Sequence, residues 1–344
     1  MNILFTAEYD ENEIKELYNL GNVRMEGWAK GLSKLSEEEL IEYSRDADII
    51  ITSYDDITKK VINSAKNLKL IACTRATPVN IDVKAAKERN IPVIYTPGRN
   101  SDSTAEFAIA LMLGISRKIP MAYKALKEGK FTGDTSQMEN VKDGLKEDVI
   151  WDMNEDSPYV IFKGTQLKHK TLGIIGYGSI GRRVSKIAKA FGMKINIYDP
   201  YVCEVDVEEP CQKKVSLETL LKESDFVSVH LKVTPDTRGF IGEKEFNLMK
   251  KTAYFINCSR GAVVDEKALI KVLRDKKIAG AALDVYAKEP IYKDHPFITE
   301  LDNVLITPHI AGATDDILAN HTKMIISDLK RFLNNENLLY EYRC

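Results

Sequence analysis

The stretch that decides the fold runs Thr171-Leu-Gly-Ile-Ile-Gly-Tyr-Gly-Ser-Ile-Gly181. Residues 172–175 are apolar and predict a short buried strand, and residues 184–191 have the apolar spacing of a helix. Between them stand Gly176, Gly178 and Gly181. In a strand–turn–helix unit the first glycine makes the tight turn, the second lets the backbone approach a pyrophosphate, and the third lets helix and strand pack closely. The N–H groups at the start of the helix then face the phosphates.

A second predicted strand, residues 194–198, ends in Asp199, eighteen residues after Gly181. A carboxylate at this place accepts hydrogen bonds from the adenosine ribose hydroxyls, and it repels the 2′-phosphate of NADP. Glycine patterns also occur in ordinary turns, so the glycines alone are weak support. Here strand, glycines, helix, second strand and terminal Asp follow one another in order, which predicts a Rossmann unit that binds NAD.

The composition favours a near-neutral protein of about two domains. The chain has 344 residues, with 49 Lys plus Arg and 51 Asp plus Glu, so its formal net charge is −2. This balance gives no electrostatic case for binding nucleic acid or an anionic membrane. No apolar run approaches the length of a membrane span, and the first residues lack the basic region of a signal peptide.

The cysteines are scattered, with neither CxxC pairs nor the spacing of a zinc site. They are Cys73, Cys203, Cys211, Cys258 and Cys344. An odd, scattered set predicts free thiols in a reducing cytoplasm, and no metal site.

Alternating strands and helices precede the glycine stretch and predict a separate α/β domain with a parallel sheet. The expected strands are residues 3–6, 47–52, 68–73 and 91–95, and the expected helices are residues 11–20, 36–44, 57–65 and 81–89. A loop is expected at residues 96–103, and one long helix at 104–130, crossing into the second domain. Residues 131–166 predict an irregular connection with one short hairpin, from apolar pieces at 149–151 and 159–162.

The alternation resumes after Asp199. The expected strands are residues 226–231, 253–257, 278–284 and 304–306, and the expected helices are residues 216–222, 244–247, 265–276 and 314–333. The last helix has an apolar stripe, Ile317, Leu318, Met324, Ile325, Leu329 and Phe332, that needs a partner surface on the first domain. We therefore expect two doubly wound parallel-sheet domains. A Rossmann domain (104–313) is inserted into a flavodoxin-like domain (1–103 and 314–344).

Three side chains that could carry chemistry follow predicted strands, where ligands bind in such sheets. Arg260 offers a fork of donors suited to a carboxylate, His309 exchanges a proton near neutral pH, and Glu289 can stabilise its imidazolium form. Beside a nicotinamide, the trio suits hydride transfer to a 2-oxo acid. Singly, each has a plainer interpretation as a surface or loop residue.

Five motifs in order resemble the D-isomer-specific 2-hydroxyacid dehydrogenases, along nearly the whole chain. They are Lys170-Thr-Leu-Gly-Ile-Ile-Gly-Tyr-Gly-Ser-Ile-Gly-Arg182, Thr234-Pro-Asp-Thr-Arg-Gly-Phe-Ile241, Phe255-Ile-Asn-Cys-Ser-Arg-Gly-Ala-Val-Val-Asp265, Ala281-Ala-Leu-Asp-Val-Tyr286 with Glu289-Pro290, and Thr307-Pro-His-Ile-Ala-Gly312. The resemblance implies that Arg260 binds the substrate carboxylate, that Glu289 orients His309, and that His309 is the acid/base. It also implies homodimers joined through the nucleotide domain, with the long helix at 104–130 taking part.

The resemblance further implies a set of cofactor contacts. Asp199 would lie on the adenosine ribose, Asp284 on the nicotinamide carboxamide, Thr237 along the cleft, and Cys258 against the nicotinamide without a nucleophilic role. The remaining contacts are Tyr177, Gly178, Ser179, Ile180, Gly181 and Gly312. Of the other histidines, His230 is expected as a packing residue near the cofactor, and His169, His295 and His321 as surface residues.

The substrate loop departs from the family pattern. Many members place Gly-x-Gly before the motif that matches Asn80-Ile81-Asp82, and here Arg75-Ala76-Thr77-Pro78-Val79 stands instead. Ala76 and Thr77 can still donate backbone N–H groups to a carboxylate, and Asn100 matches a substrate contact. We hypothesise that Arg75, with Arg99, recognises a second anionic or polyhydroxyl group. The alternative, which we weigh equally, is that both arginines are solvated loop residues without a ligand.

The leading interpretation is an NAD-dependent D-2-hydroxyacid dehydrogenase, with phosphoglycerate-like, glyoxylate or hydroxypyruvate, and sugar-acid substrates all open. The alternative from another class is a catalytically silent NAD(H)-sensing protein like the co-repressors of this fold. A formate-type dehydrogenase fits less well, because those enzymes carry Gln where this chain keeps Glu289.

Overall fold

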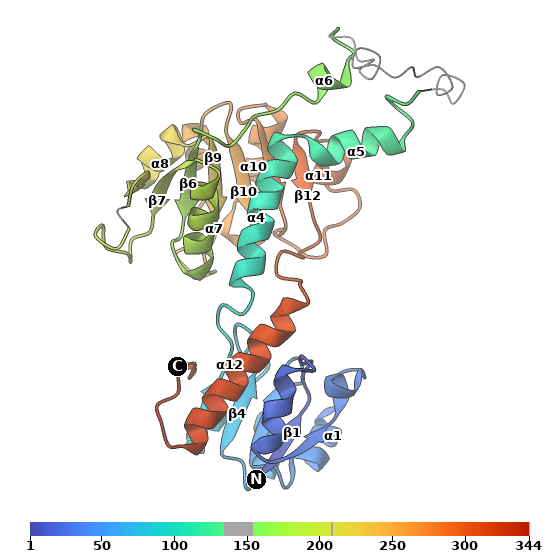
Figure 1. Cartoon of the computed structure of the whole chain (residues 1–344), viewed down its shortest axis with the longest axis vertical. Helices are drawn as coiled ribbons and strands as arrows, with labels where there is room; N and C mark the ends of the chain where they lie inside the picture. Colours follow the sequence, from blue (N-terminus) through green and yellow to red (C-terminus); the bar gives the residue numbers. More distant parts are fainter. Residues whose placement is uncertain (134–153, 208, 344) are drawn as a thin grey trace, which may run out of the picture. The chain divides into compact units, whose positions relative to one another are not determined.

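The computed structural model describes residues 1–133, 154–207 and 209–343. The chain divides into two compact units, which we call the outer unit (Met1–Asn100 with Ala313–Cys344) and the inner unit (Ser101–Gly312). In Figure 1 the outer unit is blue to cyan, with its C-terminal part in red. The first boundary falls three residues earlier than the sequence suggested. Helix α4 begins at Ser101, whose hydroxyl bonds to Ser179 of the inner unit.

The outer unit has a five-stranded sheet within the described residues, and every strand pairing in it is parallel. Across the sheet the strands are β2 (Asn22–Met25), β1 (Asn2–Phe5), β3 (Ile49–Thr52), β4 (Leu70–Cys73) and β5 (Val93–Ile94). This is the flavodoxin-like order. Strand β2 was missed in the sequence because it is a half-exposed edge strand with little apolar content.

Helices cover both faces of the outer sheet. Its elements are the 3-10 helices η1 (Glu13–Asn19) and η2 (Gly27–Lys30), with α1 (Glu37–Ser44), α2 (Lys59–Ser64), α3 (Val83–Glu88) and α12 (Asp316–Leu333). Alternating side chains of a strand point to opposite faces, so Leu4 packs with α1 to α3, and Ile3 packs with η1 and α12. The apolar stripe of α12 has its partner there, since Ile325 and Leu329 are buried in this cluster.

The inner unit holds a seven-stranded sheet in the described part, and its pairings are again parallel. In order across the sheet its strands are β12 (Val304–Ile306), β11 (Gly280–Leu283), β10 (Tyr254–Asn257), β9 (Phe226–Val229), β6 (Thr171–Ile175), β7 (Lys194–Tyr198) and β8 (Gln212–Lys214). The chain runs outward in one direction from β6 to β8, and in the other from β9 to β12. Ligands bind at such a switch point, outside the carboxyl ends of the strands.

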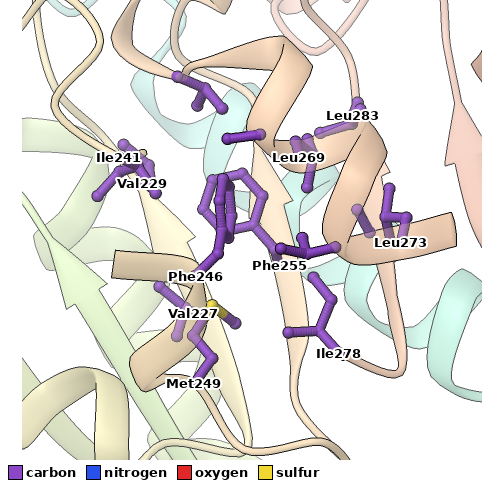
Figure 2. Packing of buried hydrophobic residues seen from close by; sticks show 14 of the residues in the cluster. Val227, Val229, Ile241, Phe246, Met249, Phe255, Leu269, Leu273, Ile278 and Leu283 are labelled. Atoms are coloured by element: carbon purple, nitrogen blue, oxygen red, sulfur yellow. The ribbon is translucent and has the colours of Figure 1, made fainter. Parts of the chain in front are cut away.

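Helices connect these strands, and the core consists of apolar side chains packed between the helices and the sheet. They are α7 (Ser179–Ala190), α8 (Leu217–Glu223), α9 (Glu243–Leu248), the 3-10 helix η4 (Gly261–Val263), α10 (Glu266–Arg274) and α11 (Pro296–Thr299). Figure 2 shows Phe246 and Phe255 at the centre of one cluster, with ring centroids 5.1 Å apart and planes at 81°. This edge-to-face contact fixes α9 on the sheet.

The continuous helix predicted for residues 104–130 is wrong. The structure has α4 (Ser101–Ser116) and α5 (Ile119–Lys127), separated at Lys118 with φ +52°. Pro120 has no N–H, so it cannot bond to the carbonyl of Ser116 and extend α4. The N–H of Thr165 donates to that carbonyl instead, at 2.9 Å.

The hairpin predicted within residues 131–166 is also wrong in its described part. Residues 149–151 lie outside the described residues. The other apolar piece forms the short helix α6 (Pro158–Ile161), capped by the hydroxyl of Ser157. Among the described helices, none combines the length and apolar content needed to cross a membrane.

Candidate active site

The glycine turn after β6 has three different environments, one for each glycine. Gly176 has φ +92°, and a Cβ there would lie 2.7 Å from the His230 carbonyl oxygen. A Cβ on Gly181 would overlap the carbonyl of Gly176, so helix α7 packs as close to the turn as a glycine allows. A Cβ on Gly178 would meet nothing within 4 Å. The middle glycine therefore borders open space, as a turn that cradles a pyrophosphate requires.

The N-terminus of α7 offers donors to that space. In the described part of the chain, no carbonyl or side chain accepts a hydrogen bond from the backbone N–H groups of Gly178, Ser179, Ile180 and Gly181. Free N–H groups at a helix N-terminus bind anions. The residues present thus fit the two phosphates of a dinucleotide.

Asp199 and Tyr177 are linked by a hydrogen bond. The N–H of Tyr177 donates to Asp199 Oδ2 at 2.7 Å, and the N–H of Tyr201 donates to Oδ1 at 2.9 Å. The Tyr177 ring is buried, with the guanidinium of Arg182 4.6 Å from its centroid. Asp199 is half-buried at the end of β7 and keeps spare acceptor capacity. The N–H of Tyr177 is not free for a phosphate.

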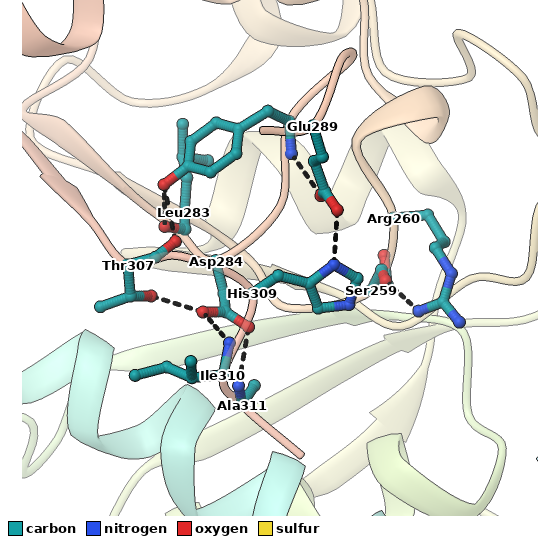
Figure 3. Close-up of polar contacts among 10 residues, drawn as sticks. Ser259, Arg260, Leu283, Asp284, Glu289, Thr307, His309, Ile310 and Ala311 are labelled. Carbon is teal, nitrogen blue, oxygen red and sulfur yellow. Dashed lines mark hydrogen bonds and ion pairs between the residues drawn. The ribbon is translucent and has the colours of Figure 1, made fainter. Parts of the chain in front are cut away.

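Arg260, Glu289 and His309 follow β10, β11 and β12, which are neighbours in the sheet. Their loops therefore leave the same edge. His309 Nδ1 lies 2.6 Å from Glu289 Oε2, and the other carboxylate oxygen accepts the N–H of Tyr286 at 3.1 Å (Figure 3). With Nδ1 on the carboxylate, Nε2 is left without a partner among the described residues, and 43% of the His309 side chain is exposed. The ring can thus present Nε2 to a substrate.

Arg260 is exposed and forms no ion pair in the described part of the chain. Its Nη1 donates to the carbonyl of Ser259 at 2.7 Å, as Figure 3 shows beside His309 and Glu289. The turn is held by Asn257, whose side chain accepts the N–H of Ser259 at 2.9 Å and donates to the carbonyl of Arg260 at 3.0 Å. The remaining donors of the guanidinium fork are available for an anion. Sequence reasoning missed Asn257, although its place directly before the turn was a signal.

Asp284 is fully buried and holds the loop that carries His309. Its carboxylate accepts the hydroxyl of Thr307 at 2.6 Å, the N–H of Ile310 at 2.9 Å and the N–H of Ala311 at 2.8 Å (Figure 3). His309 has φ +58°, a left-handed conformation that costs free energy for a residue with a Cβ. The buried carboxylate holds the loop in that conformation. Sequence reasoning missed this role.

The other predicted cofactor residues occupy the same edge of the sheet. Thr237 accepts the N–H of Thr234 at 2.7 Å and so closes the turn after β9. Cys258 is buried, and burial raises the pKa of its thiol, which keeps it protonated and supports the absence of a nucleophilic role. Gly312 is the last residue of the inner unit.

His230 stands beside the glycine turn and is neutral at physiological pH. Burial lowers the pKa of its ring to about 4. Nε2 lies 2.9 Å from the hydroxyl of Ser228, and Nδ1 is buried without a partner in the described residues. The expectation that it is not the proton donor agrees with that low pKa.

The outer unit gathers two of the predicted substrate residues around one tyrosine. The guanidinium of Arg75 lies 5.0 Å from the Tyr54 ring centroid, and the Tyr54 phenol contacts Arg99. The N–H groups of Ala76 and Thr77 have no acceptor among the described residues, and both residues are exposed. Asn100 ends the first segment of this unit.

Two of the histidines expected at the surface are buried. His295 and His321 are each 2% exposed, whereas His169 is exposed. His321 joins the carbonyl of Glu8 to Arg99 Nη1, at 2.9 and 3.1 Å. His295 caps α11 through Nδ1. Both histidines are buried because they bridge elements that are distant in sequence, which periodicity does not reveal.

Comparison with known proteins agrees with this geometry. Residues 109–311 match the model of the D-isomer specific 2-hydroxyacid dehydrogenase NAD binding domain. The chain is 38% identical to a glyoxylate reductase of Thermococcus litoralis, over 97% of this chain and 94% of that protein. It is 39% identical to a D-3-phosphoglycerate dehydrogenase of Methanocaldococcus jannaschii, over 97% of this chain but 58% of that longer protein.

A solved D-2-hydroxyisocaproate dehydrogenase matches 99% of both chains, with a TM-score of 0.79 and 25% identity. The likeness covers both sheets, and the matched family domain contains the glycine turn and the loops of Arg260, Glu289 and His309. The chain therefore belongs to the D-isomer specific 2-hydroxyacid dehydrogenases, which are NAD-dependent oxidoreductases.

Proposed function

We propose that this enzyme reduces a small 2-oxo acid to the D-2-hydroxy acid and also runs the reverse reaction. In this proposal His309 is the acid/base, Glu289 orients it, and Arg260 binds the substrate carboxylate. The observation that carries the proposal is the 2.6 Å contact of His309 Nδ1 with Glu289, which leaves Nε2 free on an exposed ring.

The chemistry follows from the charges of these groups. NADH, when bound, supplies the hydride to the carbonyl carbon. The guanidinium of Arg260 pairs with the carboxylate and orients the carbonyl. His309, as the imidazolium that Glu289 stabilises, donates a proton from Nε2 to the carbonyl oxygen as negative charge develops there, and Nδ1–H stays on the carboxylate. In the oxidative direction Nε2 accepts the hydroxyl proton.

A catalytically silent NAD(H) sensor is not favoured. The relatives are dehydrogenases and reductases, and this chain keeps the paired imidazole and carboxylate. The two functions separate in one assay, NADH oxidation with a panel of 2-oxo acids. The proposal predicts turnover of one or more 2-oxo acids. It also predicts that His309→Gln lowers this turnover 10²- to 10⁴-fold, which is the usual contribution of a general acid. The exposed His169→Gln is the control. NADH binding without turnover of any 2-oxo acid would favour the sensor.

We further propose that the substrate carries a second anionic group, such as a phosphate, which Arg75 and Arg99 recognise. Neither guanidinium has a carboxylate partner among the described residues. The backbone ties them together, because the N–H of Thr96 donates to the carbonyl of Arg75 at 3.0 Å. Two unpaired guanidiniums repel each other, which raises the affinity of the pair for an anion.

The loops that carry these two arginines contain buried polar atoms without partners. In the described residues, Trp28 Nε1, Thr74 Oγ1, Thr96 Oγ1 and Arg99 Nε have none. The Trp28 ring centroid lies 5.6 Å from that of Tyr54, so Trp28 contacts the same tyrosine as both arginines. Unsatisfied buried polar groups are costly and need a partner. An oxygen-rich ligand supplies acceptors for them.

His321 supports this interpretation by fixing Arg99. Its Nε2 faces the Glu8 carbonyl and must carry the proton, so Nδ1 accepts from Arg99. Burial, together with the neighbouring Arg99 charge, lowers the pKa of His321 to about 4, so the ring stays a neutral acceptor.

Comparing kcat/KM between phosphorylated and unsubstituted 2-oxo acids tests whether the two arginines recognise a second anionic group. We expect Arg75→Ala and Arg99→Ala to lower kcat/KM for phosphorylated 2-oxo acids 10- to 100-fold more than for unsubstituted ones. Arg24→Ala is the matched control, since Arg24 also lies over a tyrosine, 4.2 Å from the Tyr43 ring centroid, but is paired with Glu26. An unchanged ranking in both variants would eliminate the idea.

We also propose a homodimer formed through the inner unit. Large apolar side chains on α5 and α6 are exposed, including Ile119, Tyr123, Leu126 and Tyr159 at 53–68%. The two helices meet where Lys118 Nζ donates to the Ile161 carbonyl at 2.8 Å. Large apolar side chains exposed on two neighbouring helices favour an interface. Light scattering should give twice the chain mass, and Tyr123→Glu should shift it toward the monomer.

A further inference from the structure

Tyr286 joins the two proposed catalytic loops. Its N–H donates to Glu289 Oε1 at 3.1 Å, while Oε2 of the same carboxylate meets His309. Its hydroxyl donates to the carbonyl of Thr307 at 2.7 Å, two residues before His309. Burial, and then the charge of Asp284, raise the pKa of Tyr286 to about 12, so the hydroxyl stays a donor. One residue therefore braces both members of the Glu289–His309 pair.

The same loop rests on Glu266, the first residue of α10. The N–H of Ala287 donates to Glu266 Oε2 at 2.9 Å. Glu266 Oε1 lies 3.2 Å from His295 Nε2. Because His295 Nδ1 accepts the N–H of Phe297 at 3.2 Å, the proton must be on Nε2, which donates to Glu266. This is a second imidazole–carboxylate pair outside the site, with a buried imidazole and a half-buried carboxylate.

The loop of Arg260 also packs on this point. A Cβ on Gly261 would overlap the carbonyl of Tyr286 and crowd the N of Ala287. The two backbones are therefore in direct contact. Tyr286 and Ala287, in the loop of Glu289, thus contact the loop of Arg260 through their shared peptide group and the loop of His309 through the Tyr286 hydroxyl.

We propose that Glu266, held by His295, is a positioning residue that keeps the Tyr286–Ala287 peptide in place and thereby keeps Glu289 bonded to His309. This inference rests on the proposed function of His309 and Glu289. Glu266 does not touch the reacting groups. It acts through Ala287, and a displacement of about 1 Å in an acid/base pair costs on the order of 10²-fold in rate.

The test measures Glu266→Ala alone and in a Glu289→Gln background. We expect Glu266→Ala to lower kcat 10- to 100-fold, with KM for the 2-oxo acid and the Kd for NADH within about threefold of the parent enzyme. Because Glu266 acts only through Glu289, the same change should cost less than threefold in the Glu289→Gln enzyme. The pH at which kcat falls to half on the basic side should move to lower pH, because Glu289 then supports the imidazolium less.

Control variants separate positioning from general damage. Glu300→Ala removes a comparable carboxylate of the same unit, 43% exposed and paired with Arg274, and should leave kcat unchanged. Tyr286→Phe removes only the hydroxyl, with its bonds to the Thr307 and Leu283 carbonyls. It should lower kcat 2- to 10-fold without changing NADH binding, even if Glu266→Ala does not fold.

Two results would overturn the inference. One is an equal loss from Glu266→Ala in the parent and Glu289→Gln enzymes. The other is an unchanged kcat in both Glu266→Ala and Tyr286→Phe while His309→Gln is inactive. If His309→Gln itself retains the parent rate, that result contradicts the proposed function, and with it the inference that rests on that function.

Discussion

The polar groups at the carboxyl ends of the strands are hydrogen-bonded to different degrees in the two units. In the inner unit the polar groups are paired with one another: Glu289 with His309 and Tyr286, and Asp284 with three donors of the next loop. In the outer unit Arg75 and Arg99 lack carboxylate partners in the described residues, and buried polar atoms of the same loops are unsatisfied. The first edge is preorganised before any ligand arrives. Under the proposed function, the second is completed by the second anionic group of the substrate.

This difference separates chemistry from selectivity. An acid/base pair must be aligned before it reacts, so its supporting hydrogen bonds are internal. Unpaired donors instead reject a substrate that leaves them unpaired, which is the stronger form of discrimination. Changes at the inner edge should therefore alter kcat for every substrate, and changes at the outer edge should alter the order of substrates.

The largest effect is expected at Arg260. Arg260→Ala should lower kcat/KM for all 2-oxo acids about 10³-fold or more, because a charged bidentate contact is lost at the substrate. Arg260→Lys should recover only part of it, since an ammonium lacks the fork. Steady-state kinetics on several substrates checks this. A loss confined to one substrate would break the contrast between the two edges.

The next effect is expected at Asp284. Asp284→Ala leaves the Thr307 hydroxyl and two N–H groups without their buried acceptor, and it frees the strained His309 backbone. We expect roughly 3 kcal/mol lower stability and a kcat loss of about 10²-fold. Urea unfolding and kinetics measure the two. If stability fell but kcat stayed at the parent value, Asp284 would not position His309.

A smaller effect is expected in cofactor choice. Asp199→Ala should narrow the preference for NADH over NADPH about 10- to 100-fold, since the carboxylate no longer repels a 2′-phosphate. It also removes the acceptor of Tyr177 N–H, so NADH should bind somewhat more weakly. Titration of both cofactors measures the ratio. A ratio equal to the parent value would remove Asp199 from cofactor selection.

The smallest effect is the share of His321, in the outer unit, in an acid dependence of stability to which His230 of the inner unit also contributes. His321 has its pKa lowered to about 4 from the ordinary 6.5, so the folded chain binds fewer protons than the unfolded chain between these values. The contribution of neutral His321 to the free energy of unfolding is fully present above about pH 6.5. As the pH falls toward 4 the free energy of unfolding drops, by up to roughly 1.4 kcal/mol per pH unit for this group.

The variant His321→Gln sharpens that prediction. It should unfold more easily at pH 7, yet lose less stability between pH 7 and 5 than the parent enzyme. The exposed His169→Gln should keep the parent slope. Urea unfolding at both pH values gives the slopes, and equal slopes in all three proteins would show that His321 is not the acid-sensitive group.

Sequence reasoning found what strong local patterns encode. The glycine spacing located the turn and Asp199, because close backbone approach admits only glycine at Gly176 and Gly181. It also placed Arg260, Glu289 and His309 at strand ends. The parallel topology then brings strand ends to one edge of the sheet.

The features that were missed depend on tertiary context. The edge strands β2 and β8 carry few apolar residues, so their sequences resemble loops. The break between α4 and α5 had a local signal in Pro120 that the apolar periodicity concealed. The burial of His295 and His321, and the loop-holding role of Asp284, depend on partners that are distant in sequence.

The central claim is that His309, aligned by Glu289, delivers the proton to a substrate whose carboxylate Arg260 holds. A crystal structure with NADH and an unreactive 2-oxo acid analogue tests it most directly. We predict His309 Nε2 within about 2.6–3.2 Å of the analogue's carbonyl-equivalent oxygen, and a two-point contact of Arg260 with its carboxylate. An imidazole turned away from the analogue, or a carboxylate bound without Arg260, would contradict the account.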